Sequence, residues 1–133
     1  MAQTACKILL VEDEADIRTV VQLALRQDPG FQVTAFESGE AALSAIGEGL
    51  DYFDVGLFNV RLTGMDGPEL ARRIRKLRGY AHLKVIFLTA SVLPPQIQQY
   101  AQQGAVGVIG KPFDPVALPG QIRKLLDELG ENA

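Results

Sequence analysis

"DVGLFNVRLTGMDG", residues 54 to 67, reads as a buried strand that breaks into a loop. Its apolar run from Val55 to Phe58 is short and mostly continuous, which is typical of a strand covered on both faces. Asn59 stands where the strand ends and the loop begins. Other apolar runs predict four further strands, of which the second in chain order is the weakest. These runs are Ile8 to Val11, Gln32 to Phe36, Val85 to Leu88 and Val106 to Ile109.

Segments of helical period lie between these strands and after the last one. Their apolar positions are Ile17, Val20, Val21, Ala24 and Leu25; Leu70, Ile74 and Leu77; Ile97, Tyr100 and Ala101; and Leu118, Ile122, Leu125, Leu126 and Leu129. Ser38 to Gly47 is expected to form the remaining helix. Five alternations of strand and helix predict an α/β fold, a doubly wound parallel sheet with helices on both faces. Such sheets bind ligands beyond the carboxyl ends of their strands, where the strand order reverses.

Composition predicts one ordinary globular domain over residues 1–133, since the chain is 47% hydrophobic and 22% charged. A net charge of -3 and a pI near 5.1 lack the basic excess of a nucleic-acid binder. No stretch approaches the roughly 20 apolar residues that cross a bilayer, and the N-terminus turns acidic too soon for a signal peptide. We therefore expect a cytoplasmic protein without membrane contact. Cys6, the single cysteine, is expected to pack as a small residue.

Polar groups gather where the predicted strands end. Glu12 and Asp13 follow the first strand, where many nucleotide-binding sheets of this class place a glycine-rich phosphate cradle. Two carboxylates repel phosphate unless a cation lies between, and Mg2+ takes such oxygens while keeping several waters. The alternative is a helix N-terminus that favours acidic side chains through its dipole. Thr89 after the fourth strand offers a hydroxyl, and Lys111 after the fifth an ammonium that can neutralise a transferring group.

The sequence resembles the receiver domain of two-component response regulators over nearly its whole length. The matching pieces are "LLVEDE", "NVRLTGMDG", "FLTAS" and "GVIGKPFDP", in the family's order and at its spacing. The resemblance implies a flavodoxin-like (βα)5 sheet with strand order 2-1-3-4-5. It also implies a signalling domain, and no enzyme, that takes a phosphoryl group from a sensor histidine kinase or phosphotransfer protein.

The resemblance assigns a role to each strand-end residue by its position. Glu12 and Asp13 correspond to the acidic pair that binds Mg2+, and Arg61 would give its backbone carbonyl to the metal. Thr89 corresponds to the switch hydroxyl, and Lys111 to the lysine that pairs with the phosphoryl group.

Asn59 falls at the position of the aspartate that accepts the phosphoryl group. An amide oxygen is neutral and a poor nucleophile, so phosphorylation should fail there. The missing charge costs about 1 to 4 kcal/mol of Coulomb attraction, which should weaken Mg2+ binding, and it lets Lys111 pair with the remaining carboxylates. Three origins of the amide stay open. They are a natural pseudo-receiver, an engineered substitution that traps the unphosphorylated state, and a fold that keeps the site as a fossil.

Other departures from the family pattern favour natural drift. Thr63 stands where the family usually has proline, and Gly56 interrupts a central strand at a cost in packing. Val108 replaces the tyrosine or phenylalanine that swings inward when the switch hydroxyl contacts phosphate. The peptide bond before Pro112 is expected to be cis, because X-Pro bonds tolerate that isomer and the resemblance points to it.

The leading interpretation is a single-domain response regulator whose output is contact with a downstream protein. A first rival is a phosphorylation-independent pseudo-receiver, whose partner affinity would ignore small phosphodonors. A second is a flavodoxin-like electron carrier, which needs a hydroxyl- and glycine-rich phosphate loop where this chain has Glu12 to Glu14. A phosphatase with a nucleophilic aspartate fits poorly, because the first strand would have to present that nucleophile with a second acid two residues on.

Three surface features carry weaker signals. The basic residues of the third helix indicate a solvated face opposite Leu70 and Ile74, and docking of an acidic partner is the alternative. His82 lies in a polar loop without metal-ligand spacing, so we place it at the surface. The glutamine-rich segment 96–103 falls on the surface that receivers use for partners. The basic residues are Arg72, Arg73, Arg75, Lys76 and Arg78.

Overall fold

Strands and helices alternate along the described part of the chain, as the sequence predicts. The computed structural model describes residues 6–49 and 51–131 but not the side chains of 128–131, so the predicted apolar contact of Leu129 falls on a side chain that is not described. The strands are β1 (Cys6–Val11), β2 (Phe31–Phe36), β3 (Val55–Asn59), β4 (Lys84–Thr89) and β5 (Ala105–Gly110). The helices are α1 (Ala15–Leu25), α2 (Gly39–Gly47), α3 (Gly67–Arg75), α4 (Pro94–Gln102) and α5 (Leu118–Glu131).

The five strands form one parallel sheet of order β2-β1-β3-β4-β5. This confirms the predicted flavodoxin-like topology and its strand order. The order reverses between β1 and β3, which are paired through Leu10 opposite Leu57. Because the strands are parallel, the residues after β1, β3, β4 and β5 share one edge of the sheet, which is the edge where this fold class binds ligands.

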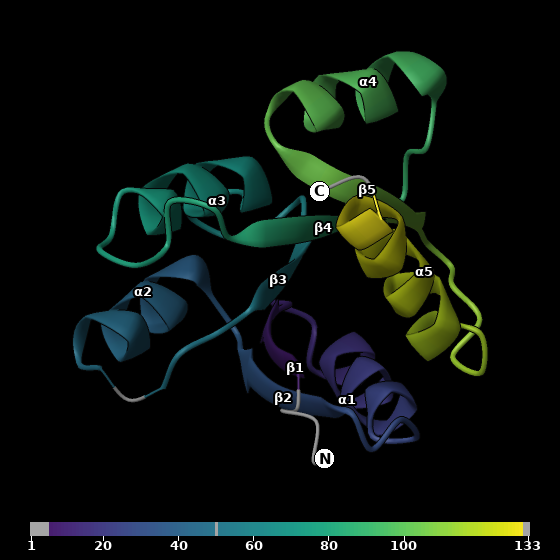
Figure 1. Ribbon diagram of the computed structural model, residues 1–133, viewed down its shortest axis with the longest axis horizontal. Helices are drawn as coiled ribbons and strands as arrows, with labels where there is room; N and C mark the ends of the chain where they lie inside the picture. Colours follow the sequence, from purple (N-terminus) through teal and green to yellow (C-terminus); the bar gives the residue numbers. More distant parts are fainter. Residues whose placement is uncertain (1–5, 50, 132–133) are drawn as a thin grey trace.

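Each face of the sheet carries its own apolar layer, as Figure 1 lets the reader follow. One layer packs against α1 and α5, represented by Leu25 and Ile122. The other packs against α2 and α3 through Ile46 and Leu70, with Tyr100 of α4 at its margin. Strand residues on both faces are buried, which explains why the central strands read as continuous apolar runs.

The predicted helices differ from the observed ones only at their ends. α2 begins one residue later than predicted, because Ser38 is its N-cap and accepts a hydrogen bond from the Ala41 N–H at 3.0 Å. Leu77 was expected on the third helix but lies in the turn after α3. Its side chain still packs, partly buried, against the α2–α3 layer. The 3.6-residue pattern therefore marked the buried face beyond the end of the helix.

Gly56 lies in the middle of β3, where the sequence predicts a cost in packing. A Cβ at Gly56 would lie 2.5 Å from a ring carbon of Phe58. The fully buried Phe58 ring therefore covers the glycine and fills space that a side chain would need.

Cys6 packs as a small residue, as expected from the sequence. Cys6 is half-buried at the start of β1 and packs against the α1–α5 layer. Burial raises the pKa of its thiol, as expected of a small packing residue. Within residues 6–49 and 51–131, no helix is both long and apolar enough to span a membrane.

Candidate functional site

Glu12 lies just beyond β1 and its side chain is fully buried. Its carboxylate accepts hydrogen bonds from the Lys111 ammonium at 2.8 Å, the Glu14 backbone N–H at 3.1 Å and the Asn59 amide at 3.3 Å. A buried carboxylate needs such partners, because removal from water is otherwise costly. The sheet thus brings Glu12 into contact with Lys111, 99 positions away in the sequence, and with Asn59, 47 positions away.

The nearly buried side chain of Asn59 holds its amide nitrogen between two oxygens. Nδ2 donates to the backbone carbonyl of Arg61 at 2.6 Å and to the Glu12 carboxylate at 3.3 Å. The flipped amide would set Oδ1 against two acceptors, so hydrogen-bond chemistry determines its orientation. Two oxygens that the resemblance assigns to a metal ion therefore already have a donor.

Asp13 is held by Thr63, from the loop after β3. Oδ2 of Asp13 accepts from the Thr63 hydroxyl at 3.1 Å and from the Thr63 backbone N–H at 3.3 Å. Burial raises the pKa of the Asp13 carboxyl, but hydrogen bonds to its charged form, with both Thr63 donors among them, outweigh burial and hold the pKa below its usual value. Asp13 is therefore an ionised, hydrogen-bonded carboxylate near neutral pH.

Thr89 and Lys111 lie in an open cleft of about 590 Å³ at this edge of the sheet. The buried Thr89 ends β4, and its Oγ1 accepts from the Ser91 N–H at 3.1 Å. The backbone N–H of Lys111 donates to the Thr89 carbonyl at 2.8 Å, and the Lys111-Pro112 bond is cis, as expected. The sequence-predicted residues that line the cleft are Asp13, Asn59, Arg61, Thr89 and Lys111. Glu12 lies beneath them, bonded to Asn59 and Lys111.

Comparison with known proteins identifies the family to which this cleft and sheet belong. The family model described as "Response regulator receiver domain" matches residues 8–123, which include most of β1, all of β2 to β5 and the whole cleft. The chain belongs to the response regulator receiver family. Receiver domains are signalling domains of two-component systems, so the family assignment favours the receiver interpretation over the electron carrier.

Relatives of this receiver include short and long proteins. It is 37% identical over 123 residues to the transcriptional regulatory protein CseB of Streptomyces coelicolor, covering 92% of this chain and 50% of CseB. It is 34% identical over 124 residues to the chemotaxis protein CheY of Pseudomonas aeruginosa, covering 92% of this chain and 98% of CheY. The solved structure of CheY4 of Vibrio cholerae matches with a TM-score of 0.81 at 30% identity, covering 92% of this chain and 99% of CheY4. The chain thus spans half of CseB and nearly all of CheY.

Receiver domains bind Mg2+ at the acidic site of this sheet edge. The residues of this receiver fit such an ion poorly, because Asn59 supplies no charge and turns its nitrogen toward the site. The oxygens expected to bind the metal, from Glu12, Asp13 and Arg61, each accept hydrogen bonds from the chain itself. Among the described residues, no group of three or more His, Cys, Asp or Glu side chains is placed to hold a metal ion.

Two contacts of the site were not predicted from the sequence. Arg18 on α1 donates to the backbone carbonyl of Glu12 at 2.8 Å. Nothing in the sequence separates Arg18 from an ordinary solvated arginine, since its contact depends on how α1 lies against β1. Thr63 stood out only as a departure from proline, and its two hydrogen bonds to Asp13 could have been suspected from its hydroxyl and N–H.

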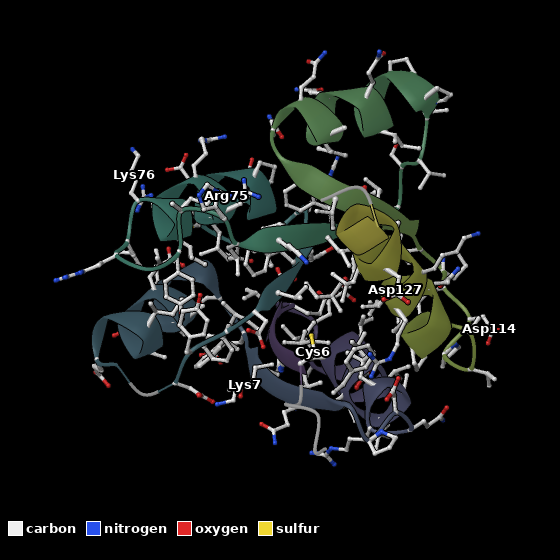
Figure 2. The ribbon with its side chains drawn as sticks, in the orientation of Figure 1. Cys6, Lys7, Arg75, Lys76, Asp114 and Asp127 are labelled. Atoms are coloured by element: carbon white, nitrogen blue, oxygen red, sulfur yellow. The ribbon has the colours of Figure 1, made fainter. Side chains whose placement is uncertain are left out.

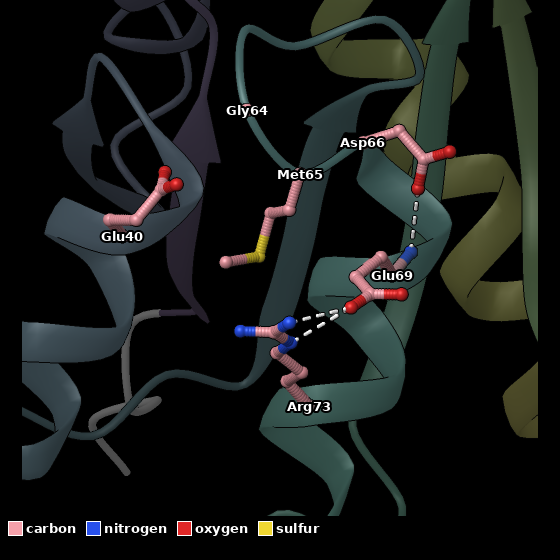
Figure 3. Close-up of a pocket in the computed structure, with 6 residues that line it drawn as sticks. All are labelled: Glu40, Gly64, Met65, Asp66, Glu69 and Arg73. Carbon is pink, nitrogen blue, oxygen red and sulfur yellow. Dashed lines mark hydrogen bonds and ion pairs between the residues drawn. The ribbon is translucent and has the colours of Figure 1, made fainter.

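A second cleft, of about 420 Å³, lies between α2, α3 and the loop before α3 (Figure 3). Asp66 is the N-cap of α3 and accepts from the Glu69 N–H at 2.8 Å, while the Glu69 carboxylate pairs with Arg73 at 2.7 Å. These contacts begin and reinforce a helix. None of the residues predicted for phosphoryl or metal chemistry lines this cleft.

Proposed function

We propose that this receiver belongs to two-component signalling, that Asn59 alone disables Mg2+-assisted phosphoryl acceptance at the end of β3, and that its output is protein contact in the unphosphorylated state. The observation that carries the proposal is the pair of hydrogen bonds from Asn59 Nδ2 to Glu12 and Arg61. An amide nitrogen thus occupies the place where a receiver's cation would join these oxygens. Mg2+ should therefore bind weakly.

The chemistry of the acceptor position supports the same proposal. A carboxylate can attack phosphorus and form an acyl phosphate, whereas the amide of Asn59 is neutral and delocalised. Lys111, which would pair with a phosphoryl group, is already paired with Glu12 at 2.8 Å. Val108, on β5, is too short to perform the aromatic rotation expected from the resemblance.

A second candidate is a phosphorylation-independent binding module, and Thr63 favours it. The proline usual in the family has no N–H, whereas Thr63 gives Asp13 both an N–H and a hydroxyl donor. Asn59 and Thr63, two departures from the family pattern, thus both donate hydrogen bonds to the acidic pair. Asn59 donates to Glu12 and Thr63 to Asp13, where other receivers would have a cation. In this candidate more than the acceptor has been lost, and restoring the acceptor alone does not restore phosphorylation.

Partners follow from the family and are part of the proposal. A sensor histidine kinase or a phosphotransfer protein is the expected upstream contact, and an unidentified protein is the downstream one. We place the receiver in the cytoplasm, as a single domain over residues 1–133 that binds no nucleic acid directly.

The variant Asn59→Asp tests the proposal. Acetyl phosphate and Mg2+ are added to the original protein, to Asn59→Asp and to the control Asn59→Ala, and intact-mass spectrometry measures phosphoryl incorporation. We expect one phosphoryl group on Asn59→Asp and none on the other two, because only the aspartate offers a nucleophile.

Equal labelling of the original protein and Asn59→Asp would contradict the proposal. Labelling of none of the three would overturn the leading candidate in favour of the binding module. A circular dichroism spectrum of each protein shows that the comparison is made between folded chains.

A further inference from the structure

Charge is distributed unevenly along the chain. Residues 70–113 contain seven of the thirteen Lys and Arg residues and none of the sixteen Asp and Glu residues. The fold keeps much of this charge on one side, because α3 and α5 cover opposite faces of the sheet. Figure 2 shows Arg75 at the end of α3 and Lys76 just after it, far from Asp114 before α5 and from Asp127 on α5. A chain of net charge -3 thus has a basic side.

A groove of about 630 Å³ opens on this side, where α3 and α4 end and β4 and β5 begin. We call it the basic groove. Arg72, His82 and Lys84 line it with basic side chains, and the buried Leu83 and partly buried Val106 add apolar surface. The groove therefore combines positive charge with an apolar component.

Arg75 joins the walls of the basic groove. Its guanidinium donates to the backbone carbonyls of Leu83 at 3.1 Å, Gln103 at 3.0 Å and Gly104 at 2.9 Å. The last two contacts neutralise the carbonyls after α4, where the helix dipole is negative. Gly104 has φ +90°, and a Cβ there would lie 2.9 Å from Arg75 Nη1. The groove is therefore built before any partner arrives.

Positive charges in the basic groove are left without strong ion-pair partners in the described part of the chain. Lys84 and His82 form no ion pair within the described part of the chain, and Arg72 pairs with Glu69 of the same helix on the exposed surface. Exposed pairs of this kind are weak and exchange readily. Gln103 also lines the groove, and its Oε1 is the one buried side-chain nitrogen or oxygen without a hydrogen-bond partner among the described residues. Because that oxygen is itself buried, the capacity offered to an incoming segment is the positive charge of Lys84 and Arg72.

We propose that the basic groove docks an acidic segment of a partner protein, with an apolar residue set among its Asp and Glu residues. Acidic residues of the partner would complement the charge of the groove, and its apolar residue would pack against Leu83 and Val106. A nucleic acid fits less well, because a phosphate backbone gains nothing from apolar surface and is repelled by the remainder of the chain. Lys84 and Thr89 begin and end β4, about 17 Å apart along the strand, so docking is independent of the state of Asn59.

The probe is a fluorescein-labelled peptide of sequence Glu-Glu-Leu-Glu-Glu-Leu-Glu-Glu, titrated at low ionic strength into the full chain. Fluorescence anisotropy measures affinity, and amide chemical shifts map the site. We expect saturable, salt-sensitive binding with shifts around residues 72–75, 82–84 and 102–106. The double variant Arg72→Gln/Lys84→Gln should weaken binding about tenfold. The matched control Arg26→Gln/Lys124→Gln, which removes two exposed cations elsewhere, should bind like the original protein.

Several results would overturn the proposal. They are the absence of saturable binding, shifts outside the basic groove, equal weakening by the control variant, or tighter binding of a DNA duplex than of the peptide. The shift map uses the unaltered protein, so it decides the question even if the double variant fails to fold. An Asn59→Asp variant should bind the peptide unchanged, which separates this inference from the function proposed above.

Discussion

At the scale of single residues, the site is organised around one buried carboxylate. Glu12 has no exposed surface and owes its charge balance to Lys111 and its hydrogen bonds to Asn59 and the Glu14 N–H. In an intact receiver the same oxygens would face a cation. Here an amide, an ammonium and Thr63 donate to the acidic pair instead, which makes the pocket a self-contained hydrogen-bonded cluster.

Lys111→Met should destabilise the fold by about 3 kcal/mol, because it leaves the carboxylate of Glu12 buried without its cation. Urea unfolding followed by circular dichroism measures the loss. Lys124→Met, an exposed change on α5, should alter stability by less than about 0.5 kcal/mol. Adding Glu12→Gln to Lys111→Met should recover part of the loss. A loss below about 1 kcal/mol for Lys111→Met would mean that Glu12 does not depend on the ammonium.

At the scale of elements, α5 is joined to the turn after α1 by one ion pair. Arg123 on α5 contacts both oxygens of Asp28, at 2.7 and 3.0 Å, and lies over the Phe31 ring at 4.5 Å from its centroid. The Gly30 N–H donates to the same carboxylate at 2.8 Å. The pair thus ties the start of β2 to the last helix on the same face of the sheet.

The Asp28 contact should make stability depend on pH in acid. The Arg123 hydrogen bonds lower the pKa of Asp28 to about 2, against about 3.9 in an unfolded chain. As pH falls, the unfolded state takes up the proton first, so the contribution is complete above about pH 4 and is lost toward pH 2. Urea unfolding should show Asp28→Asn less stable than the original protein at pH 5, with a smaller difference at pH 3. A difference that stays constant between these pH values would show that Asp28 does not titrate in this way.

At the scale of the whole molecule, the fold was more predictable than the site. Runs such as Ile8 to Val11 are buried on both faces, so their sequence carries the signal of a parallel sheet directly. The sheet order then places Glu12, Asn59 and Lys111 at one edge. The topology and the resemblance to receivers were therefore enough to predict that these three residues lie close together.

The hydrogen-bond partners within the site were less predictable, because they depend on side-chain directions that no periodicity encodes. The sequence indicated that Asn59 is a poor phosphoryl acceptor. It did not indicate that the amide nitrogen donates hydrogen bonds to Glu12 and to the Arg61 carbonyl. Similarly, the basic residues of α3 read as a solvated face. Only the fold shows Arg75 turned inward to three backbone carbonyls while Lys76 stays exposed.

Isothermal titration of Mg2+ into the original protein and into Asn59→Asp tests the central claim most directly, namely that the chain's own donors take the place of the metal. We predict that Asn59→Asp binds Mg2+ at least about tenfold more tightly, because it restores a charge and removes the amide nitrogen from the pocket. Equal affinity of the two proteins for Mg2+ would contradict the claim.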